Sequence, residues 1–111
     1  MNALRNKVQL IGRLGQEPEV LTFDDGGKIA KFSMATDDSY KDKQGQKVER
    51  TQWHNVIVRG SLVNIVENYV TKGQEIAIEG KLTSRSWDDK DGNKRYVTEV
   101  MVNELLLLGK A

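Results

Sequence analysis

Apolar and polar residues alternate along most of the chain, which is the pattern of strands with one buried and one exposed face. Three segments carry in-phase apolar residues: Val8, Leu10 and Leu14; Ala30, Phe32 and Met34; and Ile76, Ile78 and Leu82. Residues 51–60 and 94–108 supply two more strand-like segments. Between them, residues 24–27, 42–46 and 88–93 are rich in aspartate and glycine, and the last two stretches predict hairpin loops.

Residues 61–73 break the alternation and predict a short helix. Their apolar positions recur at helical spacing and form one face, made of Leu62, Ile65, Val66 and Tyr69. Ser61 is placed to cap the start of this helix and Gly73 to close its end. The chain therefore reads as three strand segments, one helix and two further strands. This order predicts an all-β protein with one short helix, namely an OB-fold, the five-stranded Greek-key barrel with a helix after strand 3.

Length and composition fit one soluble domain spanning residues 1–111. The chain has no cysteine, which agrees with a reducing cytoplasm. The first ten residues lack the apolar region of a signal peptide, and no apolar run approaches the roughly 20 residues of a membrane helix. The net charge is +1, from 17 basic and 16 acidic residues, so bulk charge does not point to a polyanionic partner.

Catalytic and metal-binding chemistry has little support in these residues. A single histidine, His54, and no cysteine exclude a catalytic triad or a zinc site. Residues 88–93 suggest a calcium loop, but Trp87 and Thr98 would occupy its first and twelfth ligand positions. We therefore predict a protein that is not an enzyme and needs no metal or cofactor. His54 shares the inward face of its strand and is expected to be a core or interface residue.

Two tryptophans fall on the polar faces of their strands. Trp87 is in phase with Arg85, opposite the apolar face, and Trp53 is in phase with Arg59. Flat aromatic rings beside cations suit single-stranded nucleic acid, because every base offers a π-face and the phosphates attract cations. The alternative is that each tryptophan covers a sheet edge or a subunit contact.

The remaining aromatic residues are less informative. Tyr40 stands at the mouth of a hairpin beside Lys41 and Lys43, although its phase with Phe32 and Met34 would bury it. Tyr69 is expected in the core on the helix face, and Phe23, Phe32 and Tyr96 are assigned to the core by default. The apolar run at residues 105–108 would be exposed unless it is covered, which predicts an oligomer.

Five segments together resemble the bacterial single-stranded DNA-binding proteins: residues 6–20, 32–46, 51–60, 69–82 and 86–100. The resemblance covers nearly the whole chain in order. It implies an OB-fold that assembles as a homotetramer. It also implies a protein that coats single-stranded DNA without sequence preference during replication, recombination and repair. A cytoplasmic, nucleoid-associated location follows from the same resemblance.

The resemblance also assigns roles by position. Tyr40, Trp53 and Trp87 fall where the family stacks bases, and Lys43 and Lys72 match basic positions near the DNA path. His54 falls where the family has a histidine near a subunit interface. With Arg59 and Arg85, these residues form the candidate site.

Some positions depart from the family pattern. Tyr40 replaces a common tryptophan, and Arg59 replaces a common phenylalanine, although arginine also stacks on bases and pairs with phosphate. Ser61 and Ser86 stand where lysine is common. The chain stops at "ELLLLGKA", where the family usually continues into a flexible tail with an acidic tip, so tail-mediated protein partners have no support here.

Two other functions remain open on the sequence alone. One is an OB-fold module that mainly contacts proteins, such as a primosomal accessory protein, which the missing tail and the absent lysines leave room for. The other is an RNA-binding OB-fold, which composition does not distinguish from a DNA-binding one.

Overall fold

The computed structural model describes residues 3–109 as one small barrel with long strands. The elements are η1 (Ala3–Arg5, a single 3-10 turn), β1 (Val8–Leu14), β2 (Glu19–Thr22), β3 (Lys28–Asp37), β4 (Tyr40–Lys41), β5 (Lys47–Val48), β6 (Thr51–Arg59), α1 (Leu62–Tyr69), β7 (Glu75–Asp88) and β8 (Lys94–Leu107). The outer ends of the predicted domain, residues 1–2 and 110–111, lie outside this range.

The long strands pair in a ring. The sheet order is β1-β7-β8-β6-β3-β2, and β1 also pairs with β3, which brings the sheet back to its first strand. All of these pairs are antiparallel except β6 and β8, which run parallel over a short stretch. Five long strands with α1 between the third and the fourth confirm the predicted OB-fold. The strand β2 and the hairpin β4–β5 are additions to this ring.

The core follows the alternation of the sequence inside the barrel. Ala30, Phe32 and Met34 of β3 are buried as predicted, and so are Ile76 and Ile78 of β7. Buried residues from the other strands and α1 complete this core: Leu14, Val56, Val58, Val63, Val66, Val70, Val100 and Val102.

The buried face of α1 differs from the predicted one. Val63, Val66 and Val70 face the core, whereas Tyr69 is 64% exposed, so its assignment to the core is wrong. The helix ends at Tyr69 because Val70 turns extended while its N–H still donates to the carbonyl of Val66. Gly73 therefore does not close the helix but lies in the following turn, at a φ of 85°. Ser61 occupies the N-cap without a side-chain capping hydrogen bond.

A β-bulge divides β8 into two phases. Glu79 pairs with Glu104 and Gly80 with Val102, so Asn103 is an extra residue with no partner of its own. Before the bulge, Val100 and Val102 point inward; after it, Leu105 packs against the core. Glu99 and Met101 therefore share the outer face with Glu104 and Leu106.

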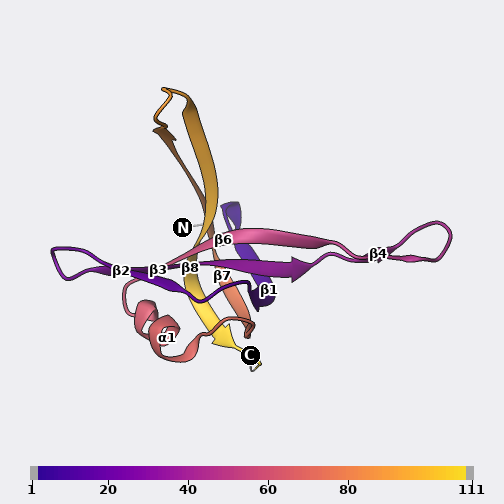
Figure 1. Cartoon of the computed structure of the whole chain (residues 1–111). Helices are drawn as coiled ribbons and strands as arrows, with labels where there is room; N and C mark the ends of the chain where they lie inside the picture. The colour runs from indigo at the N-terminus through magenta and orange to yellow at the C-terminus, as the bar shows by residue number, and fades with distance from the viewer. Residues whose placement is uncertain (1–2, 110–111) are drawn as a thin grey trace.

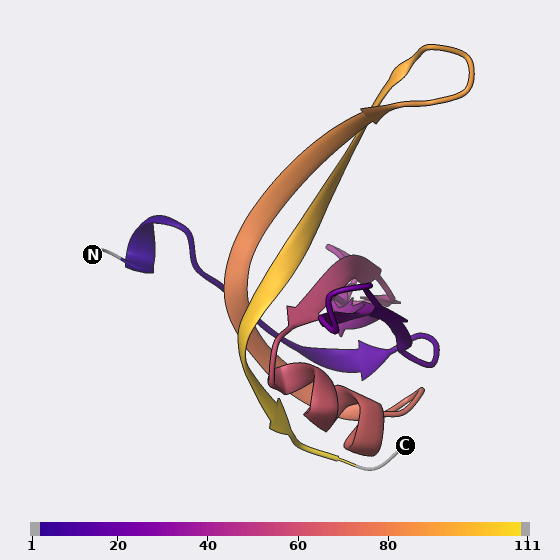
Figure 2. The same ribbon diagram turned by 90° about the vertical axis from the view of Figure 1, so that its left-hand side faces the viewer.

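Two arms extend from the barrel (Figure 1). One is the far half of the β7–β8 ribbon, which curves away from the barrel and from α1 (Figure 2), and the other is the hairpin β4–β5. On this ribbon, Leu82 is 48% and Tyr96 71% exposed. Phe23, at the β2–β3 turn, is 50% exposed. The expected burial of these three residues is therefore wrong.

Within residues 3–109, no helix is both long and apolar enough to cross a membrane.

Candidate nucleic-acid interface

A groove runs over the outer faces of β3, β6, β7 and β8. Two adjoining hollows form it, and they share Lys31, Ile57, Arg85 and Glu99. Asn55 and Val97 lie toward one end, and Arg59 and Lys81 toward the other. Ile57 is buried although it sits on the outer face, because it lies in the groove floor where β6 runs parallel to β8. The strand faces that the sequence pattern predicted to point outward are the faces that carry this groove.

Trp53 continues the groove beyond Asn55 on the same face of β6. Its side chain is 61% exposed, and it lies opposite Ala35 of β3. The edge of the six-membered part of the indole lies against Gly15, where an added Cβ would come within 2.8 Å of the ring atom Cη2. The backbone N–H of Gly15 donates to the carbonyl of Ser33, which fixes this support against β3. The ring is thus held at one edge and open to solvent.

Trp87 continues the groove beyond Arg85, on the ribbon. It is 44% exposed, and the guanidinium carbon of Arg85 lies 5.2 Å from the centroid of its ring, a cation–π distance. The Nε of Arg85 donates to Oε1 of Glu99 at 3.0 Å, and its Nη2 lies 3.5 Å from Oε2. The three side chains therefore form a connected row from the groove floor to the ribbon.

The predicted cations occupy different places. Arg59 lines the groove and is exposed, whereas Lys43 lies in the loop of the β4–β5 arm. Lys72 is exposed after α1, and its backbone N–H donates to Oε1 of Glu17. It adjoins Gly73, whose N–H donates to the carbonyl of Leu14, so Lys72 lies at the barrel edge near Gly15 and Trp53. Among the described residues, the side chains of Arg59, Lys43 and Lys72 form no ion pair.

Tyr40 is half-exposed at the base of the β4–β5 arm, where it pairs with Val48. The burial expected from its strand phase is wrong, because the chain leaves the barrel after Asp37 and the alternation no longer relates to the core. Its position on an open arm leaves the ring accessible, but the structure does not bring it into the groove.

Both arms end in turns organised by an aspartate. Asp42 accepts hydrogen bonds from the backbone N–H groups of Gln44 and Gln46, and Asp89 accepts from those of Asp91 and Asn93. Asp89 also accepts from Nε of Arg95, and this bond is the main reason its pKa is lowered below the usual value. These contacts stabilise the ribbon turn fully when the pH is above the ordinary pKa of aspartate. Their contribution is lost as the pH falls through the lowered pKa of Asp89.

His54 lies at the end of β6 nearest the arm, opposite Met34. Its Nε2 is 3.0 Å from Oγ1 of Thr36, and the ring is half-buried. It is not among the groove residues. Its assignment to a subunit interface stays a prediction.

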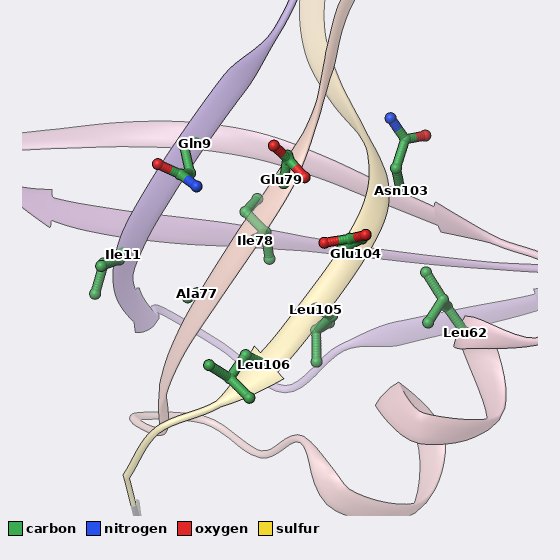
Figure 3. Close-up of a pocket in the computed structure, with 10 residues that line it drawn as sticks. All are labelled: Gln9, Ile11, Leu62, Ala77, Ile78, Glu79, Asn103, Glu104, Leu105 and Leu106. Carbon is green, nitrogen blue, oxygen red and sulfur yellow. The ribbon is translucent and has the colours of Figure 1, made fainter. Parts of the chain in front are cut away.

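A second surface covers the outer faces of β1, β7 and β8 (Figure 3). Ile11, Ala77 and Leu106 lie side by side in register, and Ile11 and Leu106 are 59% and 61% exposed. A neighbouring row contains Glu79, whose carboxylate binds Nζ of Lys7 at 2.7 Å and raises the pKa of that lysine. We call this apolar patch, made of Ile11, Ala77 and Leu106, the outer apolar face. It extends the exposed leucine run predicted from the sequence.

Sequence reasoning missed several groove residues. Glu99 has the outward phase of its strand yet is 6% exposed, and nothing local marks it as the partner of Arg85. The contact of Gly15 with Trp53 joins residues far apart in sequence, so no spacing rule finds it. Lys31 and Lys81 could have been predicted, because both lie at outward positions of strands that the sequence pattern had already identified. In residues 3–109, no three His, Cys, Asp or Glu side chains are grouped to hold a metal ion.

An OB-fold barrel with two outward tryptophans and unpaired cations along one groove defines the class of OB-fold proteins that bind single-stranded nucleic acid. Comparison with known proteins identifies the group within that class. The model of the single-strand binding protein family matches residues 5–108, and the chain belongs to this family. The family consists of binding proteins, which agrees with the prediction that the chain is not an enzyme.

Two curated relatives carry the name single-stranded DNA-binding protein 1. The one from Xylella fastidiosa is 49% identical over 106 residues, covering 95% of this chain and 78% of the relative. The one from Chlorobaculum tepidum is 43% identical over 105 residues, covering 94% of this chain but 65% of the relative.

Two solved structures are similar as well. The Plasmodium falciparum SSB in complex with ssDNA has a TM-score of 0.86 at 30% identity and covers 93% of this chain and 94% of that one. A deletion mutant of the Thermus aquaticus single-stranded DNA-binding protein has a TM-score of 0.79 at 32% identity, covering 93% of this chain and 50% of that one.

Proposed function

We propose that the chain binds and protects single-stranded DNA without sequence preference. The observation that carries the proposal is the pair of exposed indoles, Trp53 and Trp87, continuing one groove that also holds Arg59. Stacking on indoles is tolerant of sequence, and cations along the groove follow the phosphates. Family membership and the likeness to an SSB structure with ssDNA support the same function. Its setting would be replication, recombination and repair, in the cytoplasm at the nucleoid.

The proposed site residues differ in where they lie relative to the groove. Trp53, Trp87 and Arg59 lie along the groove and are proposed to meet the strand directly. Tyr40 and Lys43 lie on the β4–β5 arm and would meet it only if the strand continues onto that arm. Lys72 would meet a strand that passes Trp53. A module that mainly contacts proteins has less support, because its role would not need two exposed indoles along a groove that also holds unpaired cations.

Fluorescence tests this function directly. Titrating the protein with oligo(dT) at low salt is expected to quench the emission of Trp53 and Trp87, because stacked bases quench indoles. A duplex of the same length is expected to quench far less, since its bases are already stacked and paired. A matched RNA oligomer distinguishes a DNA binder from the RNA-binding alternative. Unchanged emission at saturating oligo(dT) would reject the stacking function.

We further propose that the chain assembles with itself, as a homotetramer. The outer apolar face supports this, because its row of Ile11, Ala77 and Leu106 is open to solvent in one copy. Covering such a face with a second copy removes apolar surface from water, which favours association. His54 is proposed to lie near a subunit contact as well.

Light scattering checks the assembly. The protein at micromolar concentration is expected to have the mass of a tetramer, and Leu106→Asp is expected to lower that mass by placing a charge in the apolar face. Tyr69→Asp is the matched control, because Tyr69 is equally exposed on α1 but is not among the residues that line this surface, and its change should leave the mass unaltered. A wild-type monomer, or equal masses for wild type and Leu106→Asp, would contradict the proposal.

A further inference from the structure

A buried carboxylate lies in the floor of the groove. The side chain of Glu99 is 7% exposed, opposite Thr83 in the β7–β8 ribbon, and Glu99 lines both hollows of the groove. A negative charge at this place opposes the approach of phosphates. The groove can accept a polyanion only if this charge is compensated.

Arg85 supplies the compensation. Its Nε donates to Oε1 of Glu99 at 3.0 Å and its Nη2 reaches toward Oε2. Removing the partner of a buried charge is strongly unfavourable, because the remaining charge has lost its water and gains nothing in return. A phosphate that drew Arg85 away would leave Glu99 in that state. Arg85 is therefore expected to stay on Glu99 when the strand binds.

The arginine still has an exposed part. Its side chain is 54% accessible, and its guanidinium carbon lies 5.2 Å from the ring centroid of Trp87. The guanidinium thus lies over the indole while part of the arginine side chain stays exposed, and a guanidinium plane is a surface on which bases stack. The pair of Arg85 and Glu99 offers this surface without a net charge.

Other cations in the groove are not committed in this way. Among the described residues, Lys31, Arg59 and Lys81 form no ion pair, and all three line the groove. A phosphate near them meets a full positive charge. The groove therefore contains two kinds of basic residue, one neutralised within the protein and the others free.

We propose that Glu99 is a positioning residue that holds Arg85 beside Trp87 as a stacking surface and withholds its charge from the phosphates. This inference rests on the proposed binding of single-stranded DNA. It assigns to Arg85 a role other than the phosphate contact that its position beside Trp87 first suggests. Neutralisation of the strand is left to Lys31, Arg59 and Lys81.

The dependence of affinity on salt tests this assignment. Each phosphate contact on a single strand contributes about 0.7 to the slope of log affinity against log salt. We compare wild type, Glu99→Gln, the double variant Glu99→Gln with Arg85→Gln, and Arg59→Gln as the reference for a free cation. Glutamine has the size of glutamate, and although it is shorter than arginine it keeps a hydrogen-bonding amide. Folding and mass are checked by circular dichroism and light scattering in the same buffers.

Glu99→Gln is expected to steepen the slope by about 0.7, because Arg85 is released to meet a phosphate. The double variant should return to the wild-type slope, since it removes a pair with no net charge, whereas Arg59→Gln should flatten it by about 0.7. The inference is overturned if the double variant is flattened as much as Arg59→Gln. That comparison holds even if Glu99→Gln alone folds poorly. A wild type that fails to bind oligo(dT) rejects the proposed function instead.

Discussion

Replacing Trp53 by alanine is expected to weaken the binding of single-stranded DNA by about 1–3 kcal/mol, the range for loss of one aromatic–base stack. This corresponds to roughly a 5-fold to 150-fold rise in Kd. The ring has the open face that stacking needs, because it is 61% exposed at the end of the groove and contacts Gly15 at one edge. Since stacking releases few counterions, the loss should be nearly the same at low and high salt.

The measurement is a titration with oligo(dT) at several salt concentrations, following the remaining emission of Trp87. Tyr69→Ala is the control, because it removes an equally exposed aromatic ring from α1, outside the groove. An unchanged Kd for Trp53→Ala in an intact oligomer would reject the stacking role. A fall in mass with unchanged affinity would instead indicate that Trp53 serves a subunit contact.

Gly15→Ala is expected to weaken the same binding, by less than Trp53→Ala does. A Cβ at this position would overlap the six-membered part of the indole and approach Oγ of Ser33, so the ring must shift. Gly15 is not among the described glycines with a positive φ, so alanine brings no backbone penalty that would confuse the result. The predicted defect therefore comes from the ring alone.

A double-mutant cycle isolates this effect. In a chain that already carries Trp53→Ala, the further change Gly15→Ala should cost almost nothing in affinity, because no ring remains to be displaced. Thermal unfolding of each variant shows whether stability has changed. If the two substitutions weaken binding additively, Gly15 acts on something other than the pose of Trp53.

Alternation in the sequence predicted the fold wherever strands enclose the core. Ala30, Phe32 and Met34 illustrate this, because each is buried in the phase that the pattern required. The same rule failed at Leu82 and Tyr96, which lie along the β7–β8 ribbon and are exposed there. Alternation describes a difference between two faces, but only the tertiary structure decides whether either face is covered.

The candidate site was predictable in part for a similar reason. Strand phase placed Trp53, Trp87 and Arg59 on an outward face, and the structure has them there. Tyr40 and Tyr69 were misplaced by phase because one lies past the end of the barrel and the other near a helix end. The support of Trp53 by Gly15 and the pairing of Arg85 with Glu99 depend on contacts between separate strands, which periodicity does not encode.

The bulge at Asn103 makes the outer surface depend on the length of β8 as well as on its composition. Before it, odd-numbered residues such as Glu99 face outward; after it, even-numbered residues such as Leu106 do so. Loss of this one residue would join Val102 directly to Glu104 in regular alternation, so Leu105 would still point inward and Leu106 outward, and only the bulge would disappear. A one-codon deletion of a paired residue elsewhere in β8 would instead shift the register by one and exchange the two faces, so the bulge is where this strand can lose a residue and keep both surfaces.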